Sequence, residues 1–217
     1  MSKSPKELNE VKGTQGQKSQ TTGPQNQRTF LEKHCDFFDP DGDGQIWPMD
    51  TFFGFWVLGF SLPICLFSVF AIHFAFSWPT QHWFPIPDLF WRINIDRIGK
   101  HGSDSGAYDH DGGFDKNAFD RMFTRNAKTH KDLLTGRELL GLMLQNKVIY
   151  DPFGWFGGAF EWLSVYLLFW PRDNMFRQED IRGLYDGSTF YEIAREQKKK
   201  GRYTPPGWED TVSGFRK

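Results

Sequence analysis

The sequence predicts a mainly α-helical protein: an EF-hand-type helix–loop–helix domain interrupted by an apolar membrane hairpin with a proline cluster. Three observations support this fold class. Apolar residues before Asp39 recur with helical spacing, a twelve-residue acidic and glycine-rich stretch follows them, and a long uncharged run begins at Phe52. The fold is therefore expected to combine a metal-type loop with a lipid-contacting segment.

The tail and the bulk composition limit the classes of function. Residues 1–27 are almost entirely polar or glycine and proline, so we expect a disordered polar tail without a secretory signal. The chain has 217 residues and a net charge of −1, which does not favour nucleic acid as a partner. The cysteines, Cys35 and Cys65, do not form a disulfide framework, which suits a cytosol-facing protein.

Residues 28–51 have the pattern of a calcium-binding EF-hand. The entering helix has one apolar face, and the loop 39–50 places Gly44 at position 6, where a sharp turn is needed. Position 12 is an aspartate instead of a glutamate, so we expect weaker Ca²⁺ affinity or some tolerance of Mg²⁺. The predicted metal ligands at positions 1, 3, 5, 7 and 12 are Asp39, Asp41, Asp43, Gln45 (through its carbonyl) and Asp50.

Residues 52–91 form an apolar segment with a proline cluster. The run 52–78 contains no Asp, Glu, Lys or Arg, and one helix of about 27 residues would be roughly 40 Å long, enough to cross a hydrocarbon core of about 30 Å. Pro63 interrupts the run, and Pro79, Pro85 and Pro87 follow it between tryptophans. Because proline turns the chain and tryptophan favours the membrane interface, a hairpin dipping into one leaflet competes with a full span.

Residues 92–195 predict a helical C-terminal part of the domain. The segment 109–115 has the spacing of a degenerate partner loop without ligands at its ends, and Thr135 and Glu138 form a capping box. The aromatic stretch 153–171 contains one charged residue, Glu161, and several glycines, which favours an interfacial or core helix. We expect residues 196–217 to form a basic, flexible tail.

Four short strings, in the same order over most of residues 30–193, resemble the caleosins of plants, algae and fungi. The second is the most specific, because no general fold rule generates it. The proline cluster is sparser than that of the family. The strings are His34-Cys-Asp-Phe-Phe-Asp-Pro-Asp-Gly-Asp-Gly, Lys100-His-Gly-Ser-Asp-Ser-Gly106, Phe153-Gly-Trp and Tyr185-Asp-Gly-Ser-Thr-Phe190.

The resemblance implies a calcium-binding haem peroxygenase on the cytosol-facing surface of lipid droplets and the endoplasmic reticulum membrane. Such an enzyme carries haem b and Ca²⁺ and moves oxygen from a fatty-acid hydroperoxide to an unsaturated lipid, by epoxidation or hydroxylation. The histidines that the family needs for haem correspond to His34 and His101, the implied catalytic and cofactor-binding residues. From the residues alone, His34 would be a helix residue packed among apolar neighbours and His101 an exposed loop residue.

A shared haem would constrain both topology and chemistry. His34 and His101 lie on either side of the apolar segment, so they reach one iron only if the chain returns to the same side of the membrane. Two axial imidazoles would leave no position for a hydroperoxide, so one histidine must be distal or leave the iron; the sequence allows either assignment. Cys35 is an alternative thiolate ligand, but it also fits a small apolar residue of the helix face.

Two other functions are compatible with the sequence. A non-enzymatic calcium-dependent coat or tethering protein of lipid droplets would use both histidines structurally, and bound haem distinguishes it from a peroxygenase. An integral calcium sensor would span a membrane through 52–78 and 153–171, and droplet targeting would exclude it. The expected partners are a lipid monolayer or the endoplasmic reticulum membrane and fatty-acid substrates, without nucleic acid; an oligomer is compatible with the sequence.

Overall fold

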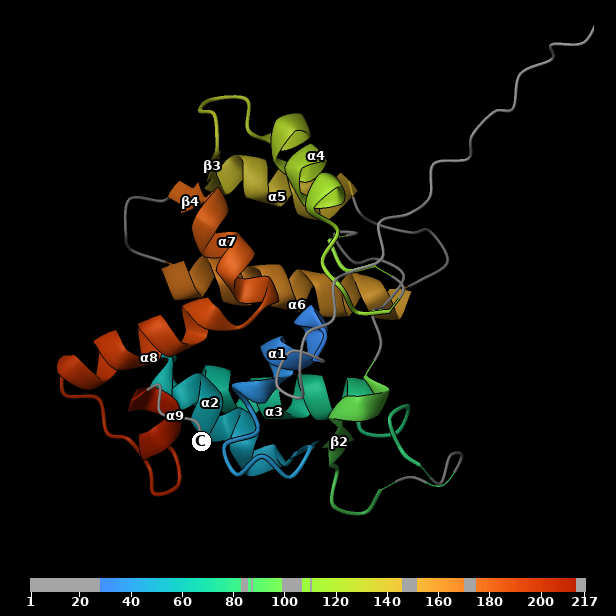
Figure 1. The fold of residues 1–217 in the computed structure, drawn as a ribbon, viewed down its shortest axis with the longest axis vertical. Helices are drawn as coiled ribbons and strands as arrows, with labels where there is room; N and C mark the ends of the chain where they lie inside the picture. The colour runs from blue at the N-terminus through green and yellow to red at the C-terminus, as the bar shows by residue number, and fades with distance from the viewer. Residues whose placement is uncertain are drawn as a thin grey trace, which may run out of the picture.

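The computed structural model describes residues 28–82, 86, 88–98, 107–109, 111–145, 152–169 and 175–213 (Figure 1). The prediction of a mainly helical chain is confirmed. The helices are α1 (Phe30–Asp36), α2 (Pro48–Val57), α3 (Leu62–Phe76), α4 (Lys116–Asn126), α5 (Gly136–Gln145), α6 (Pro152–Phe169), α7 (Gln178–Tyr185), α8 (Ser188–Lys199), α9 (Glu209–Ser213) and the 3₁₀ helix η1 (Ile95–Arg97). The strands are β1 (Gln45–Ile46), β2 (Ile93–Asn94), β3 (Leu133–Thr135) and β4 (Met175–Arg177).

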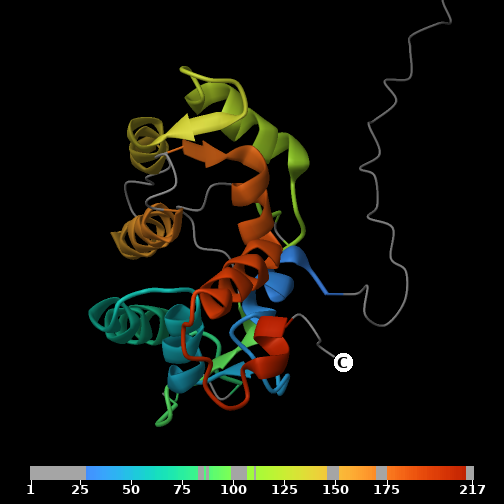
Figure 2. The ribbon, with the colours of Figure 1, turned by 90° about the vertical axis from the view of Figure 1, so that its left-hand side faces the viewer.

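The strands form two small antiparallel pairs at opposite ends of the molecule. β1 pairs with β2, aligning Ile46 with Ile93, and β3 pairs with β4, aligning Leu134 with Phe176. Figures 1 and 2 show α4 and α5 beside β3 and β4 at one end, α2 and α3 at the other, and α6 between them. The halves share a core of buried apolar side chains that includes Phe37, Phe55, Phe119, Leu139, Phe176 and Ile181.

The predicted partner loop at 109–115 does not pair with the acidic loop. Ile46 of the acidic loop lies opposite Ile93 of β2. Tyr108 forms an isolated bridge with Phe114 instead, so the segment closes on itself. The prediction of a partner loop at 109–115 is wrong.

The apolar run is divided into two helices. α2 ends near Gly59, whose φ of +99° suits a residue without a Cβ, and α3 begins after Ser61 with Pro63 in its first turn, where a missing N–H is tolerated. α2 and α3 then pack against each other. Among the described residues, no helix is long and apolar enough to cross a membrane.

The two helices differ in what they bury. α2 contributes Phe55 and Val57 to the core, whereas α3 turns a row of large apolar side chains outwards. These lie at i, i+4, i+8 and i+12 and therefore on one face of the helix. The exposed side chains of this α3 outer face are Leu62, Leu66, Phe70 and Phe74, with Phe67 and Trp78 beside them.

Part of the expected flexible tail packs onto α2. The Arg202 guanidinium lies 3.8 Å from the centroid of the Trp56 ring and donates to the backbone carbonyls of Trp56 and Phe60. Trp208 is 2 % exposed and packs on Phe37. Composition alone suggested a solvated tail, but these aromatic and guanidinium contacts fix residues 202–213 against the first half of the chain.

His73 joins the ends of α2 and α3 to the loop before β2. His73 lies within the uncharged run 52–78, where a buried polar group needs a hydrogen-bond partner. Its Nδ1–H donates to the carbonyl of Trp91, and its Nε2 accepts from the Thr51 hydroxyl at 2.8 Å. The imidazole is fully buried, and burial lowers its pKa below the usual value of 6.5, against the opposing hydrogen bond to Trp91.

This depressed pKa predicts a loss of stability in acid. The unfolded chain takes up a proton near pH 6.5 before the folded chain does, so the contribution of His73 is fully present above that pH and is lost as pH falls below it. We expect the unfolding midpoint of the wild type to fall between pH 7.5 and 5.5 more steeply than that of His73→Gln, which keeps a donor and an acceptor but does not titrate. Parallel pH profiles for the two proteins would contradict this assignment.

Candidate active site and acidic loop

The acidic loop between α1 and α2 brings three of the predicted ligands together. Carboxylate oxygens of Asp39, Asp41 and Asp43 lie within 4.8 Å of one another. Asp39 is fully buried and accepts the backbone N–H groups of Gly42, Asp43 and Gly44, which wraps the loop around its carboxylate. Three carboxylates this close repel one another without a cation, and hard oxygens in this arrangement suit Ca²⁺ or Mg²⁺.

The two other predicted ligands flank this cluster. Gln45 lies in β1, and its N–H donates to Asp43 at 2.7 Å. Asp50 accepts the N–H of Trp47 at 2.8 Å in the first turn of α2. Burial, with smaller contributions from the charges of the three loop aspartates, raises the pKa of Asp50 to about 6, against the opposing hydrogen bond from Trp47. A divalent cation in the loop would reverse this charge effect.

His34, in α1, faces the inside of the molecule. Its Nδ1 lies 2.6 Å from the carbonyl oxygen of Leu184 in α7. Because a carbonyl can only accept, Nδ1 carries the proton and the lone pair of the neutral imidazole is on Nε2. Phe190 packs edge-on against the ring at 5.1 Å between centroids, and Phe38 lies at 6.5 Å. The imidazole is thus held in one orientation and one tautomer.

The imidazole lines an apolar cavity of about 250 Å³ between the two halves of the molecule. α1, α2, α3, α6, α7 and α8 all contribute to its walls. The described polar groups at the walls are few, and Glu161 of α6 is the one carboxylate among them. Representative lining residues are His34, Phe38, Thr51, Phe55, Ile72, Ile93, Tyr108, Phe160, Glu161, Leu184, Tyr185 and Phe190.

The imidazole of His34 and the apolar walls around it are suited to holding a haem. Apolar walls suit a porphyrin, and an imidazole whose Nδ1–H is fixed by a backbone carbonyl presents Nε2 with raised basicity, as histidines that bind metals commonly do. His101, the second histidine implied by the resemblance, lies outside the described residues. His34 would therefore be the residue of the described chain that holds the iron.

The environment of Cys35, which also lines the cavity, favours a neutral thiol over the thiolate alternative. Cys35 is buried, and burial first, with the neighbouring charge of Glu32, raises the pKa of its thiol to about 12. The thiol is therefore protonated at neutral pH and acts as a small apolar group in α1.

Several features of the site have no signal in the sequence. The Leu184 carbonyl that orients His34 is 150 residues away, and a backbone acceptor carries no side-chain signature. Glu161 is recognisable in the sequence as the lone charge of an apolar helix, but its position on the cavity depends on how α6 packs.

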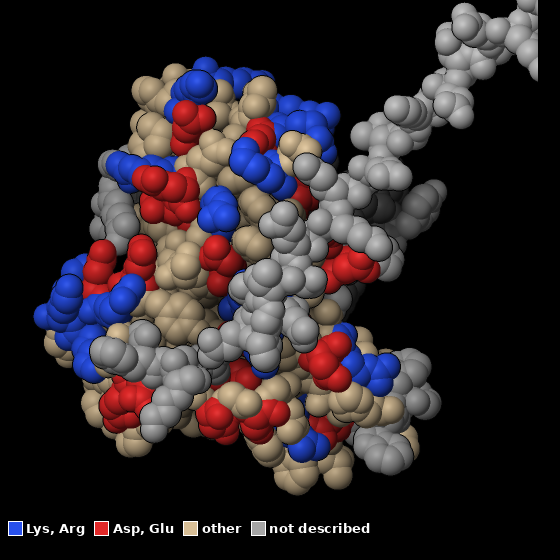
Figure 3. Space-filling model, in the orientation of Figure 1, with Lys and Arg blue, Asp and Glu red and all other residues tan. Residues whose placement is uncertain are grey.

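On the face drawn in Figure 3, acidic and basic side chains are interspersed, which agrees with the near-zero net charge.

The fold and the site define a mainly helical protein in which one short helix joins an acidic loop to an imidazole-lined apolar cavity. Comparison with known proteins then gives the family. Residues 26–194 match the family model described as caleosin related protein. The chain belongs to the caleosin family.

Curated relatives agree with this assignment. The chain is 34 % identical over 177 residues to probable peroxygenase 4 of Arabidopsis thaliana, covering 79 % of this chain and 88 % of the relative. It is 33 % identical over 174 residues to a peroxygenase of Lilium longiflorum, covering 79 % and 72 %. A probable inactive peroxygenase-like protein of Arabidopsis thaliana is 37 % identical over 91 residues, 42 % and 43 % of the two chains. No solved structure gives a significant match. These relationships make the protein a peroxygenase-type oxidoreductase.

The acidic loop predicts cation-dependent stability. Asp43→Asn removes one exposed carboxylate charge from the cluster, so we expect Ca²⁺ affinity to fall at least about 10-fold and the Ca²⁺-induced rise in unfolding temperature to shrink. Asp109→Asn is a matched control, because Asp109 also accepts backbone N–H groups in a glycine-rich turn away from the loop. Calorimetric titration and thermal melts measure both effects; equal affinities in the two variants would refute the site.

Proposed function

We propose that this protein is a calcium-binding haem peroxygenase that transfers oxygen from a fatty-acid hydroperoxide to an unsaturated lipid at the surface of lipid droplets. The observation that carries the proposal is the imidazole of His34, held by the Leu184 carbonyl at the wall of an apolar cavity. The family and the peroxygenase relatives support the reaction type.

In this proposal His34 binds haem b through Nε2, and the Leu184 carbonyl keeps the proton on Nδ1. When bound, the haem supplies the iron at which the O–O bond of the hydroperoxide is cleaved. His101 is the second family histidine, and a neutral imidazole there would take the proton from the hydroperoxide and return it to the departing alkoxide. The phenylalanine-rich walls bind the acyl chain and exclude water.

The EF-hand-type loop 39–50 holds Ca²⁺ in the same proposal. Its support is the cluster of three aspartates in the spacing that the ion needs. α1 carries His34 and ends one turn before Asp39, so the loop and the imidazole share one short helix. Ordering of the loop by an ion would therefore also order the helix that bears His34.

We further propose that the protein lies on a lipid monolayer, or on the cytosolic leaflet of the endoplasmic reticulum, through the α3 outer face. Phe70 and Phe74 are more than half exposed, and Leu89 beyond the proline cluster is 93 % exposed. An exposed apolar surface of this kind marks a site of contact with a partner or a membrane. The absence of charge in residues 52–78 favours lipid as that partner. Because α2 is part of the core, the hairpin predicted from the sequence would rest on the lipid along α3 without leaving the domain.

An absorption spectrum tests the haem proposal. Full-length protein purified with haem supplied should show a Soret band that His34→Ala loses or shifts, because the iron loses its imidazole. Added imidazole should restore the band in His34→Ala if the cavity is intact. His130→Ala, outside the cavity, is the control. A wild type without a Soret band would instead favour the non-enzymatic droplet protein.

Flotation with triacylglycerol droplets coated by phospholipid tests the docking face. Phe70→Ser with Phe74→Ser removes two exposed rings, and each ring is worth about 1 kcal/mol or more of apolar burial, so binding should fall roughly 10- to 100-fold. Leu140→Ser is the matched control, because Leu140 is 54 % exposed on α5 in the other half. Equal losses in both proteins would point to a general effect on folding or solubility.

A further inference from the structure

We infer that loop 39–50 has an ion-free partner loop in the segment 86–97, of which residues 86 and 88–97 are described. There the guanidinium of Arg92 takes the place of a second cation and so positions the calcium loop. This inference rests on the proposed calcium function of the first loop. It is carried by the backbone geometry of the two loops and by the contacts of Arg92.

The two loops pair residue for residue. Counted from Asp39, Ile46 is position 8, and it pairs with Ile93, which is position 8 when residues 86–97 are counted in the same way. The N–H of Ile95 donates to the carbonyl of Gly44 at 3.0 Å and extends the pairing. The apolar residues at position 8 thus lie opposite each other, as in two paired calcium loops.

Position 6 supports the same alignment. A calcium loop turns sharply there and normally uses glycine; Gly44 has a φ of +81°. Trp91, at position 6 of the partner loop, has a φ of +56°, a conformation that a bulky side chain rarely adopts. Apart from glycine, only Trp91 and Asp132 have positive φ among the described residues. The strained tryptophan keeps the turn of a calcium loop without its glycine.

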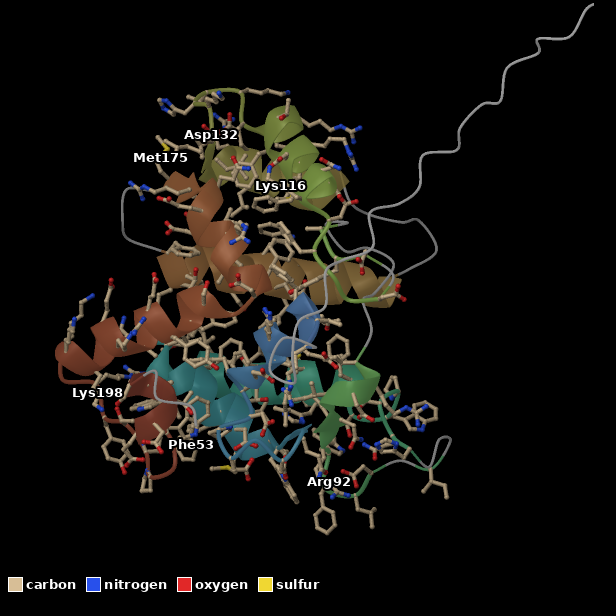
Figure 4. All side chains as sticks on the ribbon, in the orientation of Figure 1. Phe53, Arg92, Lys116, Asp132, Met175 and Lys198 are labelled. Carbon is tan, nitrogen blue, oxygen red and sulfur yellow. The ribbon has the colours of Figure 1, made fainter. Side chains whose placement is uncertain are left out.

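A second pair of loops at the other end of the molecule repeats this geometry. Figure 4 places Arg92 and Asp132 at opposite ends of the longest axis. Counted from Ala127 as position 1, Asp132 is position 6 with a φ of +63°, and Leu134 is position 8 and pairs with Phe176. The following helix begins at position 10, as α2 and η1 do in their own loops. Such agreement is not expected of unrelated turns.

Position 12 agrees as well. Glu138 accepts the N–H of Thr135, at position 9, as Asp50 accepts that of Trp47 in the calcium loop. Burial acts to raise the pKa of Glu138, but hydrogen bonds from Thr135 and Thr129 hold it at about 2. Here the loop's own N–H groups hold the carboxylate that would otherwise bind an ion. An internal group therefore closes this loop without a cation.

In the partner loop the internal group is Arg92. At position 7 it donates from Nε and an Nη to both oxygens of Asp88, at position 3, each at 3.0 Å. Position 3 supplies a carboxylate ligand in a calcium loop, so the guanidinium of Arg92 neutralises the carboxylate that an ion would otherwise bind. The guanidinium also stacks 5.2 Å from Trp47 of the calcium loop and 5.5 Å from Phe90. Arg92 therefore joins the two loops through an ion pair on one side and an aromatic contact on the other.

Calcium titration combined with amide hydrogen exchange tests this role in the full-length protein. We expect one Ca²⁺ per wild-type chain. Arg92→Leu and Arg92→Lys should both lower Ca²⁺ affinity at least about 10-fold and speed exchange of the Ile95 amide, because lysine keeps the charge but not the two-pronged contact. Lys116→Leu is the control, since Lys116 also pairs with an aspartate four residues away, but in α4 of the other half.

The outcomes separate this inference from the proposed function. If the wild type binds no Ca²⁺, the calcium function fails, and exchange at Ile95 in Arg92→Leu still tests the loop pairing. Two ions per chain would overturn the inference. Tighter Ca²⁺ binding in Arg92→Leu would also overturn it, because Arg92 would then act by charge repulsion alone. Unchanged hydrogen exchange of the Ile95 amide in Arg92→Leu would overturn it as well.

Discussion

The reversal of the chain at Gly59 is the feature on which the rest of this half depends. An uncharged run of about 27 residues could extend as one helix, but the turn folds it into two. The start of α2 and the end of α3 then lie at the same end, where Thr51 and Trp91 are hydrogen-bonded to the buried imidazole of His73. The segment before α2 and the segment after α3 are thereby brought together, and β1 pairs with β2. The pairing of the acidic loop is thus a consequence of breaking the apolar run.

Helix α1 connects the acidic loop to the cavity. It is seven residues long, opens with the Thr29–Glu32 capping box and ends just before the acidic loop. Its inner face carries His34, whose hydrogen bond to Leu184 crosses to the second half of the chain. A single short helix therefore fixes the loop on one side and the imidazole on the other, and neither can move far without displacing the other. This explains why His34 stands so close in sequence to the first aspartate.

The sequence predicted what local chemistry determines and missed what long-range packing determines. The helical class, the acidic loop and the break at Pro63 follow from spacing and turn residues. The pairing of Ile46 with Ile93 could not be predicted, because the partner loop has no carboxylate at positions 1, 5 and 12 and no glycine at position 6. Trp91 adopts the turn at that position against its own preference. Residues 202–213 looked like a solvated tail because the aromatic contacts that fix them are distant in sequence.

α3 also links the proposed lipid face to the cavity. Phe70 and Phe74 point outwards, while Ile72 and Ala75 on the opposite side line the cavity wall. A helix is only about 10 Å across, so lipid on one side and substrate on the other would be separated by one layer of side chains. Phe67, half exposed on α3, packs edge-on against Phe160 of the cavity wall at 5.6 Å. An acyl chain passing between these two rings would exchange one apolar surface for another, and its entry would not require exposure to water.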